Sequence, residues 1–133
     1  MAAAVLDTGA LVDLERLDLG EHGDGFLLLA AVTIGELAFG LDRCDAAEQQ
    51  ARLARMRYAL REYEILPFGM EEAKLYGALA ALVRLRGRDP RPRRLDLQIA
   101  ATAAAARLPL LTANPADFAG IEGLVDVVAV HRA

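Results

Sequence analysis

This chain has one cysteine, one lysine, no tryptophan and no long hydrophobic run. The single thiol, Cys44, cannot form an internal disulfide, so a reducing compartment is expected. Charged residues interrupt every apolar segment before it reaches the roughly 18 residues of a membrane helix. Asp7 also interrupts the apolar start of the chain, which does not fit a secretory signal peptide. The sequence therefore predicts a cytoplasmic protein without membrane contact.

The residues that are present indicate one globular domain spanning 1–133. Hydrophobic residues make up 55% of the chain, which excludes a disordered protein, and the length suits a single core. The formal net charge is −4, yet six arginines and only one acid lie between Arg84 and Arg94. Arginine forks bind phosphate well, although a solvated helix end is the ordinary reading of such a run. The candidates for RNA-phosphate contacts are Arg86, Arg88, Arg91, Arg93 and Arg94.

Apolar stretches that read as strands alternate with segments of helical periodicity. This order predicts an α/β fold with a central parallel sheet of four to five strands and helices on both faces. Thr33 followed by Glu36 matches the capping-box pattern at the start of a helix. Strands are expected at 2–6, 26–32, 64–67, 108–112 and 125–130, helices at 8–17, from 33, at 46–62, 70–86 and 95–107, and loops at 20–25 and 88–94.

Acidic residues occur at equivalent points of this pattern. Asp7 follows the first strand, Asp117 follows the strand at 108–112, and Glu36 and Asp96 lie in the opening turns of helices. Each acid alone could simply cap a helix or end a turn. Together they can converge beyond the carboxyl ends of the strands, where such sheets bind ligands. Carboxylates so close raise each other's pKa unless a cation lies among them, and oxygen ligands suit Mg²⁺ or Mn²⁺.

Four segments resemble the motif blocks of PIN-domain ribonucleases, in particular the VapC toxins of bacterial toxin–antitoxin pairs. The resemblance runs nearly the length of the chain and in the same order. It implies that Asp7, Glu36, Asp96 and Asp117 are the catalytic, metal-binding acids. Thr8, Thr112 and Asn114 would orient the carboxylates or hold waters. Asn114 stands about where many relatives have the fourth acid, so either Asn114 or Asp117 fills that fourth position. The segments are Val5-Leu6-Asp7-Thr8, Glu36-Leu37-Ala38-Phe39-Gly40, 96–103 (Asp-Leu-Gln-Ile-Ala-Ala-Thr-Ala) and 111–118 (Leu-Thr-Ala-Asn-Pro-Ala-Asp-Phe).

The resemblance also implies an activity and partners. We expect an Mg²⁺-dependent endoribonuclease, with Mn²⁺ as a substitute, that leaves 5′-phosphate and 3′-hydroxyl ends. A VapB-type antitoxin would neutralise it by placing its C-terminal segment in the acidic cleft. A homodimer is expected, with the stripes Leu53/Met56/Leu60 and Leu75/Leu79/Leu82 as candidate interfaces. Two alternatives remain open: an RNA-processing PIN nuclease without an antitoxin, and a non-catalytic PIN-like module that binds RNA or protein, which the amide at Asn114 makes conceivable. The sequence does not specify which RNA is cut.

Overall fold

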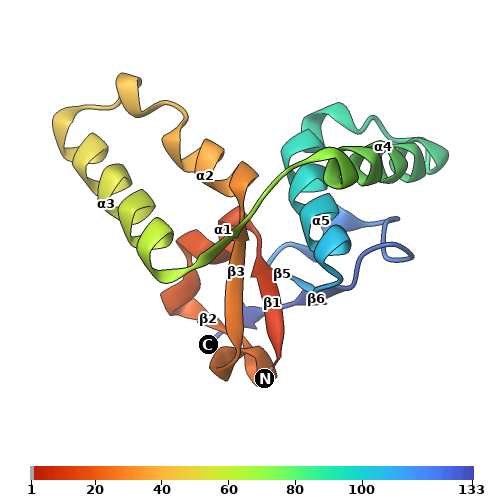
Figure 1. Cartoon of the computed structure of the whole chain (residues 1–133), viewed down its shortest axis with the longest axis horizontal. Helices are drawn as coiled ribbons and strands as arrows, with labels where there is room; N and C mark the ends of the chain where they lie inside the picture. Colours follow the sequence, from red (N-terminus) through yellow and green to blue (C-terminus); the bar gives the residue numbers. More distant parts are fainter. Residues whose placement is uncertain (1) are drawn as a thin grey trace.

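The computed structural model describes residues 2–133 and is built around a five-stranded parallel sheet. The strand order is β4-β3-β1-β5-β6, with β1 at the centre (Figure 1). A short antiparallel pair, β2 with β7, lies apart from this sheet. The predicted α/β class, parallel sheet and helices on both faces are confirmed. In chain order the elements are β1 (Ala3–Leu6), α1 (Thr8–Val12), η1 (Leu14–Arg16), β2 (Leu17–Asp18), η2 (Gly20–Asp24), β3 (Phe26–Ala30), α2 (Ala31–Ala38), η3 (Leu41–Arg43), α3 (Ala46–Glu62), β4 (Glu64–Leu66), α4 (Met70–Leu85), η4 (Arg91–Arg93), α5 (Arg94–Ala106), β5 (Leu110–Thr112), η5 (Pro115–Phe118), β6 (Val127–Ala129) and β7 (His131–Arg132), where η marks a short 3-10 helix.

The sheet is buried on both faces, which explains its nearly continuous apolar strands. Alternate residues of a strand point to opposite faces. Val5 therefore packs into one core, together with Leu79 of α4 and much of α5. Leu6 packs into the other core, with Leu37 of α2 and Ala59 of α3. The two cores hold the helices in fixed positions above the strand ends.

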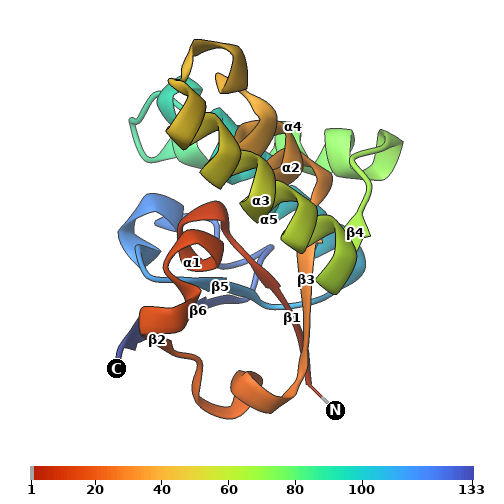
Figure 2. The same cartoon turned by 90° about the vertical axis from the view of Figure 1, so that its left-hand side faces the viewer.

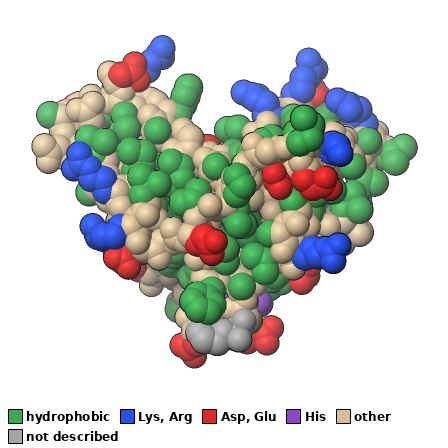
Figure 3. Space-filling model, viewed as in Figure 1, with side chains coloured by type: hydrophobic (Ala, Val, Ile, Leu, Met, Phe, Trp, Pro, Cys, Tyr) green, Lys and Arg blue, Asp and Glu red, His purple; other side chains and the backbone are tan. Residues whose placement is uncertain are grey.

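The carboxyl ends of the central strands open between two arms of the molecule. One arm is α2 with α3 and the other is α4 with α5, and both termini lie at the opposite end (Figures 1 and 2). The surface is hollowed between the arms, as Figure 3 shows. Leu6, the last residue of β1, pairs with Leu111 of β5. Residues that directly follow these two strands therefore lie beside each other at the base of the notch.

The helix predicted for 8–17 ends early, at Val12. A 3-10 turn follows, and then Leu17 and Asp18 pair with Arg132 and His131 as an antiparallel ribbon. Leu17 packs against the second core in this position. Local periodicity could not predict that Leu17 belongs to a strand. The strand forms only by pairing with a segment more than a hundred residues away in the chain. The predicted loop at 20–25 contains a 3-10 helix, η2.

The capping-box prediction for Thr33 and Glu36 was wrong. Helix α2 begins at Ala31, so the strand predicted for 26–32 ends at Ala30, and Thr33 lies inside the helix. The Thr33 side chain is fully buried, and Ala30, at the N-cap, makes no side-chain capping bond. Glu36 thus has no capping role and its carboxylate is free to serve another contact.

The two apolar stripes considered for a dimer interface are mostly used by the cores. Leu79 is fully buried, and Leu75 and Leu82 pack against the first core. Met56 packs against the second core, whereas Leu60 is about half exposed.

Within residues 2–133, no helix combines the length and apolarity required to cross a membrane.

Candidate active site

Asp7 has a capping role and also faces the notch. It directly follows β1, and its backbone N–H donates to the Leu111 carbonyl over 3.1 Å, which fixes it beside β5. Oδ1 accepts from the Ala10 N–H at 2.7 Å and so caps α1. Burial raises the pKa of Asp7, and the charge of Asp117 adds to this, while the Thr112 hydroxyl and the Ala10 N–H oppose it. The capping role of Asp7 is therefore confirmed, and its role in the site stays a prediction.

Glu36 is held by the first helix. Thr8 donates its hydroxyl hydrogen to Glu36 Oε1 at 2.7 Å. The Thr8 oxygen also lies 3.1 Å from the hydroxyl oxygen of the buried Thr33. These contacts connect α1, which follows β1, to α2, which follows β3. The Glu36 carboxylate is consequently directed by a side chain adjacent to Asp7.

Asp96 responds to the charges of the other three acids. It lies in the first turn of α5 and is partly buried. Its pKa is raised to about 6, first by burial and then by the charges of Asp117 and Asp7, with a further contribution from Glu36. Arg93 opposes the shift. The charges of Asp7, Glu36 and Asp117 therefore all act on Asp96, and the role of the four acids as one site stays a prediction.

Asp117 is paired with an arginine. Arg93 Nη2 lies 3.0 Å from Asp117 Oδ1, and Arg93 Nη1 lies 3.9 Å from Asp96 Oδ2. A guanidinium therefore lies against two of the four acids. The inward role of Arg93 was not distinguished in the sequence from that of its neighbours, although the Arg93/Asp96 spacing of three residues was a usable signal.

Thr112, at the end of β5, and Asn114, two residues later, border the same site. The Thr112 hydroxyl accepts from the Asn114 backbone N–H at 2.9 Å. A Cβ added at Gly9 would lie 3.8 Å from Asp7 Oδ1 and 4.0 Å from Asn114 Nδ2. Asn114 therefore presents its amide to the same small space as the Asp7 carboxylate.

The donor chemistry of these residues suits a hard divalent cation. Carboxylate oxygens are the preferred ligands of Mg²⁺ and Mn²⁺, and a cation would relieve the mutual repulsion that raises the pKa of Asp96. In the arrangement seen over residues 2–133, no three His, Cys, Asp or Glu side chains converge closely enough to hold one ion. Arg93 supplies the positive charge next to Asp117 and Asp96 in that arrangement.

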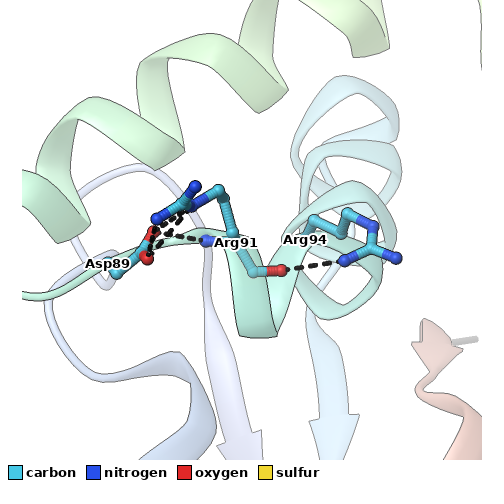
Figure 4. Close-up of polar contacts among 3 residues, drawn as sticks. All are labelled: Asp89, Arg91 and Arg94. Atoms are coloured by element: carbon cyan, nitrogen blue, oxygen red, sulfur yellow. Dashed lines mark hydrogen bonds and ion pairs between the residues drawn. The ribbon is translucent and has the colours of Figure 1, made fainter.

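Of the other arginines in the basic segment, Arg94 borders the acidic site, whereas Arg91 is paired outside it. Arg91 forms an ion pair with Asp89 at 2.8 Å, and Arg94 donates to the Arg91 carbonyl at 3.2 Å (Figure 4). Arg86 and Arg88 are exposed. Basic side chains gather at the end of the α4–α5 arm, beside the notch (Figure 3). Contacts between these arginines and RNA phosphates stay a prediction. Arg93 differs from the other arginines because it contacts the acids.

A small pocket opens beside the acids. Its volume is about 240 Å³, and it is lined by Glu36, Pro92, Arg94, Leu95 and Asp96. A larger pocket of about 540 Å³, between α1 and α3, contains none of the four acids. We take the smaller pocket as part of the site because two of its lining residues are carboxylates of the cluster.

Known proteins resemble this chain over almost its full length. The PIN domain family matches residues 4–124. Ribonuclease VapC1 of Rickettsia felis is 30% identical over 131 residues, with 90% of this chain and 91% of the relative covered. Ribonuclease VapC5 of Mycobacterium tuberculosis is 30% identical over 135 residues, with 98% and 96% covered. The solved structure of VapBC-5 from M. tuberculosis, a member of the VapBC family of toxin–antitoxin systems, is 28% identical, with a TM-score of 0.72 and 97% and 98% of the two chains covered. The chain belongs to the PIN-domain family.

Proposed function

We propose that this protein is a divalent-metal-dependent endoribonuclease and the toxin of a VapBC-type pair. The observation that carries the proposal is the gathering of acids at the carboxyl edge of the sheet: Arg93 contacts both Asp96 and Asp117, and Glu36 and Asp96 line the same pocket. Relatives that match over at least nine-tenths of their length are named as VapC ribonucleases. An acidic site at the carboxyl edge of a parallel sheet suits phosphodiester hydrolysis by a bound dication.

The role proposed for each residue follows from its position in the site. Asp7 and Asp96 would hold Mg²⁺ (or Mn²⁺), and Glu36 and Asp117 would complete the ligand set. When bound, such an ion supplies Lewis-acid activation of water and neutralises charge on the phosphate. Thr8 keeps the Glu36 carboxylate in place through its 2.7 Å hydrogen bond. Asn114 offers an amide next to Asp7, where it can hydrogen-bond a water or a substrate oxygen.

The notch between the two arms gives RNA access to the acids. Arg94 lines the pocket that contains Glu36 and Asp96, which puts a cation where a neighbouring phosphate can bind. The exposed Arg86 and Arg88 lie farther along the same basic segment. The phosphate backbone would be held by these arginines while the scissile bond lies over the carboxylates. Attack of water on phosphorus would then break the P–O3′ bond and leave 5′-phosphate and 3′-hydroxyl ends.

The antitoxin partner is proposed from the assemblies in which similar chains occur. VapBC-5 of M. tuberculosis belongs to a toxin–antitoxin system, and a 28% identical chain with a TM-score of 0.62 comes from a toxin–antitoxin complex of Klebsiella pneumoniae. An antitoxin segment that carries an arginine could enter the notch and pair with the carboxylates. Co-purification of this protein with the product of an adjacent small reading frame, and loss of RNA cleavage in the complex, would test this part. A homodimer also remains a proposal, which light scattering of the purified protein tests.

The activity itself is tested with purified protein and total cellular RNA. The assay compares Mg²⁺, Mn²⁺ and EDTA, and includes Asp7→Ala with Asp89→Asn as a matched control. Asp89 is an exposed acid paired with Arg91, outside the cluster. Discrete products that require the metal, disappear in Asp7→Ala and persist in Asp89→Asn support the proposal. Equal cleavage by Asp7→Ala, or tight RNA binding without metal-dependent cleavage, would contradict it, and the second result would favour a non-catalytic module.

A further inference from the structure

Arg93 differs from the other arginines of its segment because it faces the acids. Its two Nη atoms lie 3.0 Å from Asp117 Oδ1 and 3.9 Å from Asp96 Oδ2. These carboxylates come from η5 and α5, so one guanidinium connects two elements that both border the site. Arg91, two residues earlier, instead pairs with Asp89 outside the site (Figure 4). The contacts of Arg93 are therefore specific to its position and are not a general property of the basic segment.

The carboxylate oxygens that contact Arg93 are the atoms that a dication would need. Asp117 Oδ1 accepts the shorter of the two contacts, and Asp96 Oδ2 the longer. A cation bound to Asp117 Oδ1 would compete with the guanidinium for that oxygen, and its positive charge would repel the guanidinium. Among residues 2–133, no group of three acids converges on one point. An ion that takes Asp117 Oδ1 as a ligand must displace Arg93 from that oxygen.

Arg93 can leave without disturbing the core. Its side chain is 52% exposed, against 29% for Asp117 and 32% for Asp96. It belongs to the 3-10 turn η4, whose backbone is restricted by Pro90 and Pro92. The rotation that frees the carboxylates therefore takes place in the arginine side chain, through solvent. Half-exposed ion pairs contribute little to stability, so the cost of breaking these contacts is small.

We infer that Arg93 is a built-in cation that shares the acidic site with the metal: it compensates Asp117 and Asp96 when the ion is absent and is displaced when the ion binds. This inference rests on the proposed metal dependence. Competition for the same oxygens is reciprocal, so the arginine lowers the apparent affinity for the metal. It also keeps the metal-free site from bearing uncompensated negative charge. Arg93 is thus a positioning residue that sets the metal concentration at which the site fills.

Calorimetric titration of Mn²⁺ into metal-free protein tests the competition directly, without reference to cleavage. Arg93→Gln should bind Mn²⁺ about five- to tenfold more tightly than wild type, because both the competitor and its repulsion of the ion are removed. Arg84→Gln is the control. It removes the same charge from an exposed arginine that makes no ion pair or side-chain hydrogen bond among the described residues, and its affinity should stay within about twofold of wild type.

Arg93→Lys provides a second variant, because a single ammonium cannot contact both carboxylates as the guanidinium fork does. We expect its Mn²⁺ affinity to lie between those of wild type and Arg93→Gln. Circular dichroism in EDTA establishes that each variant is folded. Unchanged or weaker Mn²⁺ binding by both Arg93 variants, beside normal binding by wild type, would overturn this inference alone. Absence of Mn²⁺ binding by the wild-type protein would instead overturn the proposed metal dependence.

Discussion

The hydroxyl of Thr8 donates a 2.7 Å hydrogen bond to Glu36, across the gap between the first two helices. Thr8 directly follows Asp7, so a displacement of Asp7 would also change the orientation of the Glu36 carboxylate. The bond joins segments that are 28 residues apart in the chain. It fixes the side of the acidic site that Arg93 does not contact.

Replacement of Thr8 by valine should reduce RNA cleavage with little effect on folding. Valine keeps the shape of the side chain but leaves Glu36 without its donor, and loss of such a supporting contact costs about 10- to 100-fold in activity. The free energy of unfolding should fall by only about 1 kcal/mol. Steady-state kinetics and thermal denaturation measure the two effects.

Thr102→Val is the matched control for this change. Thr102 donates to the Gln98 carbonyl within α5 at 2.9 Å and contacts none of the acids. Its replacement should have a similar effect on stability and leave kcat/KM near the wild-type value. A similar loss of activity in both variants would mean that Thr8 acts only through the general stability of the fold.

Asp96→Asn should abolish cleavage while preserving or raising the stability of the metal-free protein. The change removes a partly buried carboxylate whose charge Asp117 and Asp7 repel. We expect at least a hundredfold loss of kcat/KM, since a metal ligand is lost. Thermal melts in EDTA measure the stability. A variant that melts well below wild type, and is inactive for that reason, would argue for a structural role of Asp96.

The stability of the metal-free protein should depend on pH through Asp96. Its pKa is about 6 in the folded chain and about 4 in an unfolded one, so the folded state binds the proton more tightly. The resulting stabilisation is present at pH 4 and is lost as the pH rises through about 6. Burial raises the pKa of Asp7 as well, so its contribution has the same sign.

Melting curves of wild type and Asp96→Asn, recorded in EDTA from pH 4.5 to 7.5, isolate this effect. The asparagine variant mimics the protonated acid, so the difference between its melting temperature and that of wild type should grow in its favour by about 3–5 °C as the pH rises. A difference that stays constant across this range would contradict the shifted pKa. Protons should also compete with Mn²⁺ and weaken its binding below about pH 6.

Gly25 is required by the close approach of β3 to β1 at their first residues. The Phe26 N–H donates to the Ala2 carbonyl at 2.9 Å, and a Cβ at Gly25 would collide with that same oxygen. Gly25→Ala should therefore lower the free energy of unfolding by about 2 kcal/mol. Gly23→Ala, which meets open space two residues earlier, should change it by less than about 0.5 kcal/mol. Equal stability of the two variants in urea denaturation would show that the strands adjust at no cost.

The sequence predicted the parts of the fold that depend on local patterns. Helix α3 spans 46–62 as expected, since Asp45 caps it and Met56 and Ala59 face the second core. The placement of the acids after strands and at helix starts predicts one site, and the charges of Asp7, Glu36 and Asp117 do act on Asp96 in the structure. The early end of α1 could not be predicted in this way, because Leu17 is held by pairing with the last residues of the chain.

The sequence also could not predict the direction in which individual side chains point. Thr33 and Glu36 match a capping box in sequence, but the helix begins two residues earlier and Thr8 takes the Glu36 carboxylate. Six arginines in one segment are equivalent by composition. Only the three-dimensional structure separates Arg93, which contacts Asp117, from Arg91, which contacts Asp89.

The central claim is that Asp7, Glu36, Asp96 and Asp117 form a single cation site, and an anomalous-diffraction map from crystals grown with Mn²⁺ tests it most directly. We predict a peak at the carboxyl ends of β1 and β5, with oxygens of Asp7 and Asp96 as ligands and the Arg93 side chain turned away from Asp117. A map without a peak among these acids at saturating Mn²⁺, with Arg93 still bound to Asp117, would contradict the account.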